Sequence, residues 1–334
     1  MSDNSPVPSQ VLGAWLQSEK HHKTNEPLDH FLLQFSSEHT RRNYKADLEN
    51  FFLFWESFGT ESVTDLSAFN EKHILVWMEQ FKQSSTKARK LASLGSFFAF
   101  CEKRGWLSDN PCRLLKRPKV TNRKSAQALT EEEVEKLLQH LYNRAFDHIF
   151  EGAHAVRQKS AALLRFTVIH TLLSVGMRVD ELCELRVCDL EIHDTAAKLN
   201  FVTKGGDEHR VIIAQHCLNV ILHYLSELRP ERGSNDFLFQ RVQTGQKPQK
   251  LTQTAVFKMM NESAIEAGIN KSVSPHSARA TVATVLHRQG TPLGFIQTLL
   301  NHKQITTTAK YVKKANERGE SAALKAPVSH WLSK

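Results

Sequence analysis

Residues 274–313, SPHSARATVATVLHRQGTPLGFIQTLLNHKQITTTAKYVK, place more phosphate-binding side chains on a helical pattern than any other stretch of the chain. Pro275 favours a helix that begins near His276. His276 and Arg279 then lie three residues apart, which puts both side chains on one helix face. This segment therefore predicts a helical unit that presents an imidazole and a guanidinium together.

The second half of this segment carries a further histidine and a tyrosine. Gly290 is expected to end the first helix, after which Thr291 as N-cap and Pro292 at the first position begin a helix that reaches His302. The threonine run before Tyr311 can cap a last short helix that carries this tyrosine. Whether the four side chains converge depends on the rest of the chain.

Length and charge limit the class of protein. At 334 residues the chain is too long for one ordinary domain, so two are expected, and 40% hydrophobic residues are sufficient for folded cores. The 44 Lys and Arg residues against 35 Asp and Glu residues give a net charge of +9. This excess favours a polyanionic partner such as nucleic acid.

Compartment signals are weak but consistent. The start, MSDNSPVPSQ, lacks the basic and apolar regions of a signal peptide, and no run of about 18 apolar residues predicts a membrane span. The five cysteines, at 101, 112, 183, 188 and 217, do not form paired zinc-binding spacings. We therefore expect a soluble cytoplasmic protein with reduced, mostly buried thiols and no zinc site.

The first part of the chain predicts a small helical domain over 26–112, after a flexible lead-in over 1–25. In residues 39–59, HTRRNYKADLENFFLFWESFG, one helix face carries Tyr44, Leu48, Phe51, Phe52 and Trp55. Two further helices are expected over about 71–82 and 85–104.

Basic residues cluster at the starts of these helices and in the linker expected over 113–127. The first twelve residues of this linker, RLLKRPKVTNRK (113–124), contain six basic residues and no acidic one. Pro118 opposes a continuous helix there, which favours a linker that follows a phosphate backbone. A solvated linker and ordinary solvated helix faces remain the alternatives. The residues predicted to contact DNA are Arg41, Arg42, Lys45, Lys87, Arg89, Lys90, Lys116, Arg117, Lys119, Arg123 and Lys124.

A second domain is expected over 128–315. Thr130 and Glu133 predict a capping box at its first helix, flanked by a hydrophobic staple of Leu129 and Val134. A helix over about 158–175 is apolar on nearly all sides and is expected to be buried. Helices are also expected to begin near Arg178 and over about 215–228 and 252–267.

A hairpin interrupts the helical pattern of this domain. The runs KLNFVT (198–203) and HRVII (209–213) have strand composition, and the glycines at 205 and 206 between them mark a turn. Lys204 is expected at the tip. This is the only strong sheet signal in the chain.

The ordered segments GMRVDEL (176–182), TKGG (203–206), HSAR (276–279) and LLNHKQITTTAKY (299–311) resemble the signature elements of the tyrosine recombinases, the phage-integrase-like enzymes. The resemblance covers about 26–315. It implies a mainly α-helical fold, with an N-terminal SAM-like core-binding domain that binds DNA and a helical catalytic domain with a small antiparallel β-sheet. The implied catalytic residues are Arg178, Lys204, His276, Arg279, His302 and Tyr311.

The resemblance also implies a role for each side chain. Tyr311 would attack a DNA phosphodiester, forming a 3′-phosphotyrosyl bond and releasing a 5′-hydroxyl. Arg178 and Arg279 would stabilise the extra negative charge of the transition state, each by roughly 3 kcal/mol. The covalent bond conserves the energy of the phosphodiester, so the resemblance implies that the reaction needs neither ATP nor a metal, and no cofactor is expected.

The other three catalytic residues implied by the resemblance would transfer protons or bind the phosphate. Lys204 resembles the general acid for the leaving 5′-oxygen, His276 the residue that assists proton transfer from the tyrosine, and His302 a hydrogen-bond donor to phosphate. Glu181, one turn after Arg178, is expected to orient a neighbouring histidine or arginine. Singly, each of these residues is more often an ordinary structural or surface residue.

The other tyrosines do not compete for the role of nucleophile. Tyr44, Tyr142 and Tyr224 lie in apolar helical patterns and are expected to be core or half-buried, whereas Tyr311 lies between two lysines. This chain differs from the usual family pattern at three positions. Ala278 replaces a bulkier apolar residue, Ala280 often a histidine, and Asn301 the usual glycine.

The tail 316–334 ends in an apolar segment, which in this family commonly docks on a neighbouring protomer; packing on its own domain is the alternative. The implied partners are double-stranded DNA and further copies of the chain, as a tetramer joined at a Holliday junction. Two other functions remain open at this point: a DNA-relaxing enzyme like the type IB topoisomerases, and a non-catalytic DNA-binding regulator on an integrase scaffold.

Overall fold

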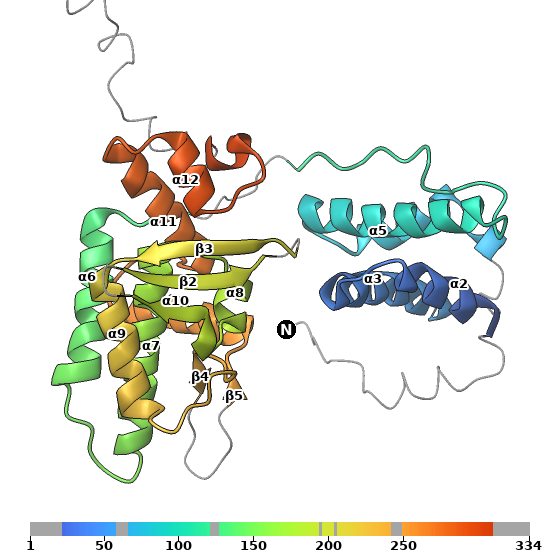
Figure 1. Ribbon diagram of the computed structural model, residues 1–334. Coiled ribbons are helices and arrows are strands. Elements are labelled where there is room, and N and C mark those ends of the chain that lie inside the picture. Colours follow the sequence, from blue (N-terminus) through green and yellow to red (C-terminus); the bar gives the residue numbers. More distant parts are fainter. Residues whose placement is uncertain are drawn as a thin grey trace, which may run out of the picture. The chain divides into compact units, whose positions relative to one another are not determined.

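The computed structural model describes residues 22–57, 66–120, 127–193, 196–203, 206–241 and 249–309, with backbone alone at 22–26 and 39. The chain divides into two compact units, residues 1–123 and 124–334 (Figure 1). The fold is mainly helical with small antiparallel sheets, as predicted. None of the described helices is long and apolar enough to cross a membrane. Outside the described residues lie the lead-in up to residue 21, Arg123, Lys124, Lys204, Tyr311 and the tail.

The N-terminal unit is a set of helices around an aromatic core. It comprises α2 (His22–Leu33), α3 (Glu38–Glu56), the 3₁₀ turn η2 (Leu66–Ala68), α4 (Glu71–Glu79) and α5 (Ser84–Lys103). Phe51 of α3 is fully buried and meets the rings of Trp77 and Phe98 edge-on, with centroids 5.1 and 6.2 Å apart. Such edge-to-face contacts add to the stabilisation from burial. Helix α2 begins at His22, inside the stretch expected to be a lead-in. This start was not predicted because the first turn is polar and lacks a helical pattern of apolar residues.

The buried face of α3 is the predicted one. Leu48, Phe51 and Phe52 are buried, while Tyr44 and Trp55 are half-buried. The helical spacing of the apolar residues was therefore sufficient to identify this face.

A buried ion network corrects one of the predicted DNA contacts. Asp47 is 2% exposed, forms an ion pair with Arg89, and lies 3.3 Å from Lys90 Nζ. Its carboxylate also accepts a hydrogen bond from Ser93 at 2.8 Å. Lys90 is itself buried, with Nζ 5.2 Å from the centroid of the Trp77 ring. A buried carboxylate requires a buried cation, so Lys90 neutralises Asp47 in the interior and does not lie on a DNA-facing surface.

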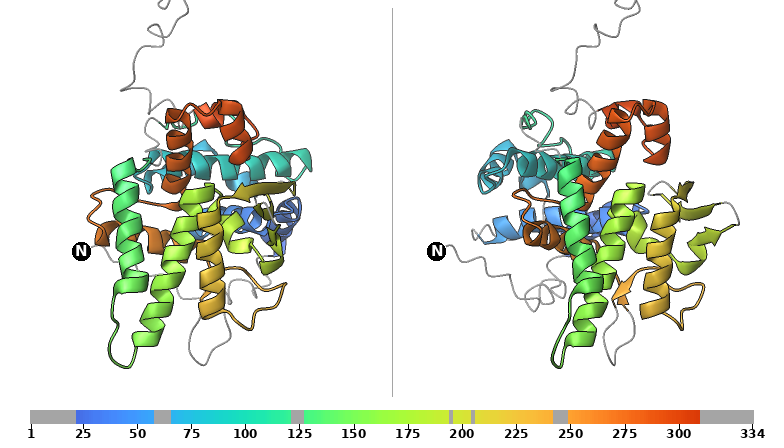
Figure 2. Two further views of the ribbon diagram at one scale, coloured as in Figure 1. Left: turned by 60° about the vertical axis from the view of Figure 1, so that its left-hand side comes forward. Right: turned by 90° about the vertical axis from the view of Figure 1, so that its left-hand side faces the viewer.

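The second unit is built around one buried helix. Its helices are α6 (Glu131–Tyr142), the π-helical turn η3 (Asn143–Asp147), α7 (Ala155–Val175), α8 (Val179–Glu184), the 3₁₀ turn η4 (Val187–Asp189), α9 (Gln215–Leu228), α10 (Gln253–Glu266), α11 (Pro275–Arg288) and α12 (Leu293–Leu299). Helix α7 lies between α6 and α9 (Figure 2) and also packs against α11. Its apolar surroundings on several sides explain why its sequence lacks a polar face.

The predicted hairpin is confirmed as part of a three-stranded antiparallel sheet. β2 (Ala197–Val202) pairs with β3 (Glu208–Ile213), and β1 (Leu190–Ile192) lies on the other side of β2. Alternate residues of β2 are buried, as period-two patterning requires. The short strands β1, β4 (Gln240–Arg241) and β5 (Gln249–Lys250) were not predicted, because two or three residues are too few to show alternation.

Helix boundaries agree with the predictions at α6 and differ at α12. The capping box of α6 is present, with Thr130 accepting from the Glu133 backbone and Glu133 accepting from the Thr130 backbone. At α12 the cap is Pro292 rather than Thr291, and the helix ends at Leu299 rather than reaching His302. A separate helical turn follows over 305–309.

Two predictions about side chains have different outcomes. All five cysteines are free and only Cys188 is exposed, as expected. Tyr224 is fully buried, but Tyr142 is 46% exposed and the prediction for it was wrong. Tyr142 is the last residue of α6, and its ring contacts that of Phe146 in the π-helical turn, with centroids 4.7 Å apart and the planes tilted by 38°, instead of entering the core.

Gly176 lies close to Val282 of α11 and to Leu300 at the end of α12. It ends α7 with φ +69°, in the left-handed region that favours glycine. A Cβ atom here would lie 2.8 Å from Leu300 Cδ2 and 3.2 Å from Val282 Cβ. Both the backbone conformation and the space therefore require glycine.

We predict that Gly176→Ala lowers the free energy of unfolding by about 2–4 kcal/mol, because it adds overpacking to left-handed strain. Urea denaturation would measure the loss. Gly268→Ala is the matched control, since Gly268 has φ +72° but no atom within 4 Å of a built Cβ. Equal losses in the two variants would show that close packing at Gly176 is unimportant.

Candidate active site

Arg279 of α11 is a buried cation that joins the ends of two other helices. Arg279 is 3% exposed. Nη1 donates to the Gly176 carbonyl at the end of α7 at 2.8 Å, and Nη2 donates to the Leu300 carbonyl at the end of α12. Nε donates to His302 Nε2 at 3.3 Å. The fork of the guanidinium thus gathers the last carbonyls of two helices and one imidazole.

Arg178 approaches the same place from the start of α8. Glu181 accepts from the Arg178 backbone and from Nη1, each at 2.7 Å, and Nη2 donates to the Asn301 carbonyl at 3.0 Å. Glu181 is 3% exposed, whereas one third of the Arg178 side chain is exposed. Glu181 therefore orients Arg178 itself.

Asn301 explains one departure from the family pattern. It is the one described non-glycine residue with positive φ, at +47°. Glycine is preferred at such a position after a helix, and asparagine is the most tolerant substitute. The substitution therefore keeps the chain reversal that places the Leu300 and Asn301 carbonyls beside Arg279 and Arg178.

His302 is held on several sides. It is 7% exposed, its carbonyl accepts from Gln297 Nε2 at 2.8 Å, and its Nδ1 lies 2.9 Å from Thr308 Oγ1. Burial, followed by the charges of Arg279 and Arg178, lowers the pKa of His302 to about 4. The ring is therefore neutral at neutral pH.

His276 lies one turn before Arg279 on α11. His276 is exposed to solvent. Loss of solvent on its inner side, and then the charge of Arg279, lower its pKa below the ordinary value. A neutral imidazole open to solvent beside the buried Arg279 is able to accept a proton from a substrate group.

The structure thus brings together four of the six predicted catalytic residues: Arg178, His276, Arg279 and His302. Lys204 and Tyr311 belong to segments next to described parts, namely the turn after Thr203 and the stretch after the helical turn 305–309. Their positions remain predictions.

The predicted DNA contacts of the N-terminal unit differ in exposure. Arg42, Lys45 and Arg89 are exposed, although each forms an ion pair, and Arg41 and Lys87 are half-buried. Of the predicted contacts in the linker segment, Lys116, Arg117 and Lys119 are exposed, and Arg123 and Lys124 lie outside the described residues.

Two residues of this region were missed by sequence reasoning. His209 Nε2 lies 3.2 Å from the Leu299 carbonyl and so connects β3 to the end of α12. For Thr308 the sequence predicted only a place in the threonine run that caps a helix, and not a contact with His302. An open hollow of about 650 Å³ beside His302 is lined by His209, Phe295 and Asn301 among others. Strand position alone gives no signal for a contact such as that of His209.

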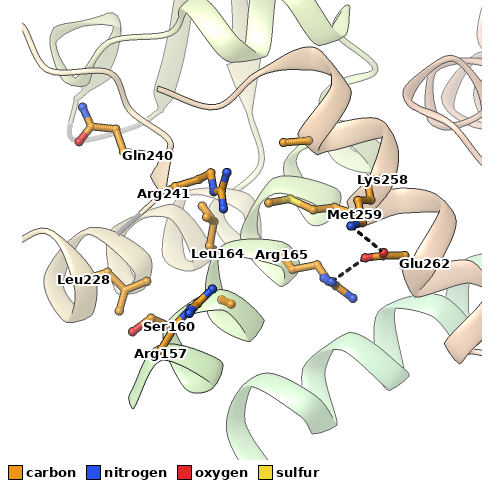
Figure 3. Close-up of a pocket in the computed structure, with 12 residues that line it drawn as sticks. Arg157, Ser160, Leu164, Arg165, Leu228, Gln240, Arg241, Lys258, Met259 and Glu262 are labelled. Atoms are coloured by element: carbon orange, nitrogen blue, oxygen red, sulfur yellow. Dashed lines mark hydrogen bonds and ion pairs between the residues drawn. The ribbon is translucent and has the colours of Figure 1, made fainter. Parts of the chain in front are cut away.

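A second hollow lies among α7, the end of α9, β4 and α10 (Figure 3) and includes none of the predicted catalytic residues. Its volume is about 320 Å³. Glu262 pairs there with Arg165 at 3.1 Å and with Lys258 at 3.7 Å. Glu262 offsets only part of the positive charge of this hollow, which also includes Arg157 and Arg241. Because it includes none of the predicted catalytic residues, this hollow is a weaker candidate than the arginine cluster.

Comparisons with known proteins cover nearly the whole described chain. The Phage integrase family matches residues 127–318, and the Phage integrase N-terminal SAM-like domain matches 28–105. The chain is 31% identical over 290 residues to tyrosine recombinase XerC of Halalkalibacterium halodurans, covering 84% of this chain and 89% of that protein. It is 28% identical to tyrosine recombinase XerD of Oceanobacillus iheyensis, covering 82% and 87%.

Solved structures share the fold at lower identity. The XerH site-specific recombinase bound to palindromic difH substrate, a post-cleavage complex, has a TM-score of 0.65 at 21% identity, over 85% of this chain and 79% of that chain. The lambda integrase tetramer bound to a Holliday junction has a TM-score of 0.62 at 17% identity, over 96% and 83%.

The pKa of His302 predicts how stability depends on pH. Unfolded histidine takes up a proton near pH 6.5, whereas folded His302 does so only near pH 4. The free energy of unfolding should therefore fall as pH decreases from about 6.5 to 4, by up to about 1.4 kcal/mol per pH unit from this residue. Urea denaturation of wild type and His302→Gln at several pH values measures this, and the variant should show the smaller slope. Identical slopes would contradict the assignment.

Proposed function

The chain belongs to the phage integrase family, that of the tyrosine recombinases, and we propose on this premise that it is a site-specific DNA recombinase. It would cleave and rejoin DNA strands through a 3′-phosphotyrosyl intermediate and a Holliday junction, and so integrate, excise or resolve DNA elements. The observation that supports this function best is the convergence of Arg178, Arg279 and His302 from three separate segments. Two permanent cations and one neutral imidazole suit a phosphodiester in its transition state.

The proposed first step breaks one bond and forms one. The Tyr311 oxygen attacks phosphorus, its proton passes toward His276, and the bond to the 5′-oxygen of the next nucleotide breaks. Lys204 gives that oxygen a proton, which yields a 5′-hydroxyl. The lowered pKa of His276 keeps it neutral and able to accept a proton near neutral pH.

The arginines would act on the phosphate oxygens. The partly exposed Arg178 side chain would contact a nonbridging oxygen, and Glu181 would keep its guanidinium oriented. Arg279 supplies the second charge, and His302 supplies a hydrogen bond. Rejoining reverses the step, with the 5′-hydroxyl of a partner strand as nucleophile.

The two units would divide the work. Residues 26–112 form the clamp domain on double-stranded DNA, 113–127 the basic linker, and 128–315 the catalytic domain. Strand exchange at a Holliday junction needs four active sites, so we propose a tetramer on DNA, with the tail 316–334 docking between protomers. The chain would work in the cytoplasm, where bacterial DNA lies.

Replacing Tyr311 by Phe should abolish covalent capture of DNA. Wild type should form an adduct resistant to SDS with a suicide substrate containing its site, detected by gel electrophoresis of labelled DNA, because cleavage transfers the strand to the phenolic oxygen. Tyr142→Phe is the matched control and should retain the adduct, since Tyr142 lies at the exposed end of α6. An adduct in Tyr311→Phe would refute the proposal.

Replacing Lys204 by Ala should slow single-turnover cleavage of ordinary DNA by about 100-fold or more, the usual size of a general-acid contribution. A substrate with sulfur in place of the bridging 5′-oxygen should restore most of the rate, because a thiolate leaves without a proton. The measured quantity is the ratio of the two cleavage rates. Lys198→Ala on β2 should leave this ratio unchanged. If Lys204→Ala also leaves it unchanged, Lys204 is not the general acid.

A further inference from the structure

Thr308 is fully buried although its side chain is polar. It is 0% exposed, and its Oγ1 lies 2.9 Å from Nδ1 of His302. The two threonines before it differ, because Thr306 is exposed and Thr307 only half-buried. Thr308 thus brings a hydroxyl to the inner nitrogen of a histidine whose outer nitrogen faces Arg279.

The contact with Arg279 determines which nitrogen of His302 carries the proton. Arg279 Nε donates to His302 Nε2 at 3.3 Å. A guanidinium has donors only, so Nε2 must be the acceptor. The neutral ring therefore carries its proton at Nδ1, and Thr308 Oγ1 accepts it.

A phosphate ligand reverses this requirement. A nonbridging phosphate oxygen accepts hydrogen bonds, so His302 can bind it only through a proton at Nε2. Nδ1 then becomes an acceptor and needs a donor. A hydroxyl can accept or donate after rotating, whereas a carbonyl or carboxylate can only accept. Thr308 is therefore suited to both forms of the ring.

We propose that Thr308 is a positioning residue for His302, an inference that rests on the proposed recombinase function. In the free enzyme the hydroxyl accepts from Nδ1–H. With DNA bound, the ring loses the proton at Nδ1 and takes one up at Nε2, so its charge does not change. The hydroxyl then donates to Nδ1, and Nε2–H donates to the phosphate. Arg279 Nε then loses Nε2 as its acceptor and donates to the phosphate instead, so the ring can keep its place.

The same hydrogen bond has a second consequence for the nucleophile. Thr308 belongs to the helical turn 305–309, and Tyr311 follows three residues later in the sequence. The contact therefore joins the turn that precedes Tyr311 to the cluster of His302 and Arg279. A variant that loses the hydroxyl should affect cleavage rather than DNA binding.

The test measures the single-turnover rate of covalent adduct formation on a suicide DNA substrate. Thr308→Val keeps the volume and removes the hydroxyl, so it should slow the rate about 10- to 100-fold by leaving Nδ1 without its partner. Thr308→Ser keeps the hydroxyl and should stay within about threefold of wild type. Thr306→Val is the matched control on the same turn and should leave the rate unchanged.

A double-mutant cycle separates positioning from mere structure. If Thr308 acts through His302, Thr308→Val should slow His302→Ala by less than about twofold. Equal slowing in both backgrounds, or a Thr308→Ser rate as low as that of Thr308→Val, would overturn the proposal. If wild type forms no adduct, the proposed function itself fails; if wild type does and Thr308→Val matches it, only the role of Thr308 fails.

A spectroscopic measurement keeps the test independent of the folding of Thr308→Val. In protein with ¹⁵N-labelled histidine, NMR distinguishes the two tautomers, and the signals absent in His302→Ala identify this ring. The free wild-type protein should show the proton at Nδ1. A proton at Nε2 would contradict the hydrogen-bond assignment on which the proposal stands.

Discussion

The buried guanidinium of Arg279 is the constraint on which the second unit depends. A buried charge without partners is strongly unfavourable, so its donors must all find acceptors. Its acceptors include the Gly176 and Leu300 carbonyls and the ring of His302. The ends of α7 and α12 must therefore meet at α11. This explains why Gly176 has no room for a side chain and why Asn301 takes a left-handed conformation that turns the chain back beside the arginines.

The same arrangement controls the charge of the neighbouring groups. Arg178 and Arg279 lie beside two histidines, and Glu181 is the carboxylate that contacts Arg178. Burial and the positive charges lower the pKa values of His276 and His302, so both rings stay neutral near neutral pH. A neutral ring can accept a proton or change tautomer, whereas an imidazolium can do neither. The arginines thus prepare the site for an anionic substrate and also keep its histidines available for proton chemistry.

The N-terminal unit shows the limit of reading charge from sequence. Lys87, Arg89 and Lys90 form one basic cluster along the chain, yet their environments differ. Lys90 and Arg89 neutralise Asp47, a residue 42 and 43 positions away from them and 2% exposed. Lys90 is consequently buried, whereas Lys116, Arg117 and Lys119 of the linker segment are exposed. Local clustering indicates a basic surface only where no distant carboxylate is buried beneath it.

Sequence alone was sufficient for what depends on local periodicity and capping. The apolar face of α3, the capping box of α6, the buried helix α7 and the β2–β3 hairpin all follow from spacing within a few residues. The order of the motifs also identified Arg178, His276, Arg279 and His302 as candidates. Only the tertiary structure decided what those side chains contact, because their partners come from positions far away in the chain. Arg279 donates to the carbonyl at the end of α7, and Asp47 forms an ion pair with Lys90 in the core. His209 contacts the last carbonyl of α12, and Thr308 contacts Nδ1 of His302. Contacts of this kind arise when helix ends pack together, and no local pattern records them.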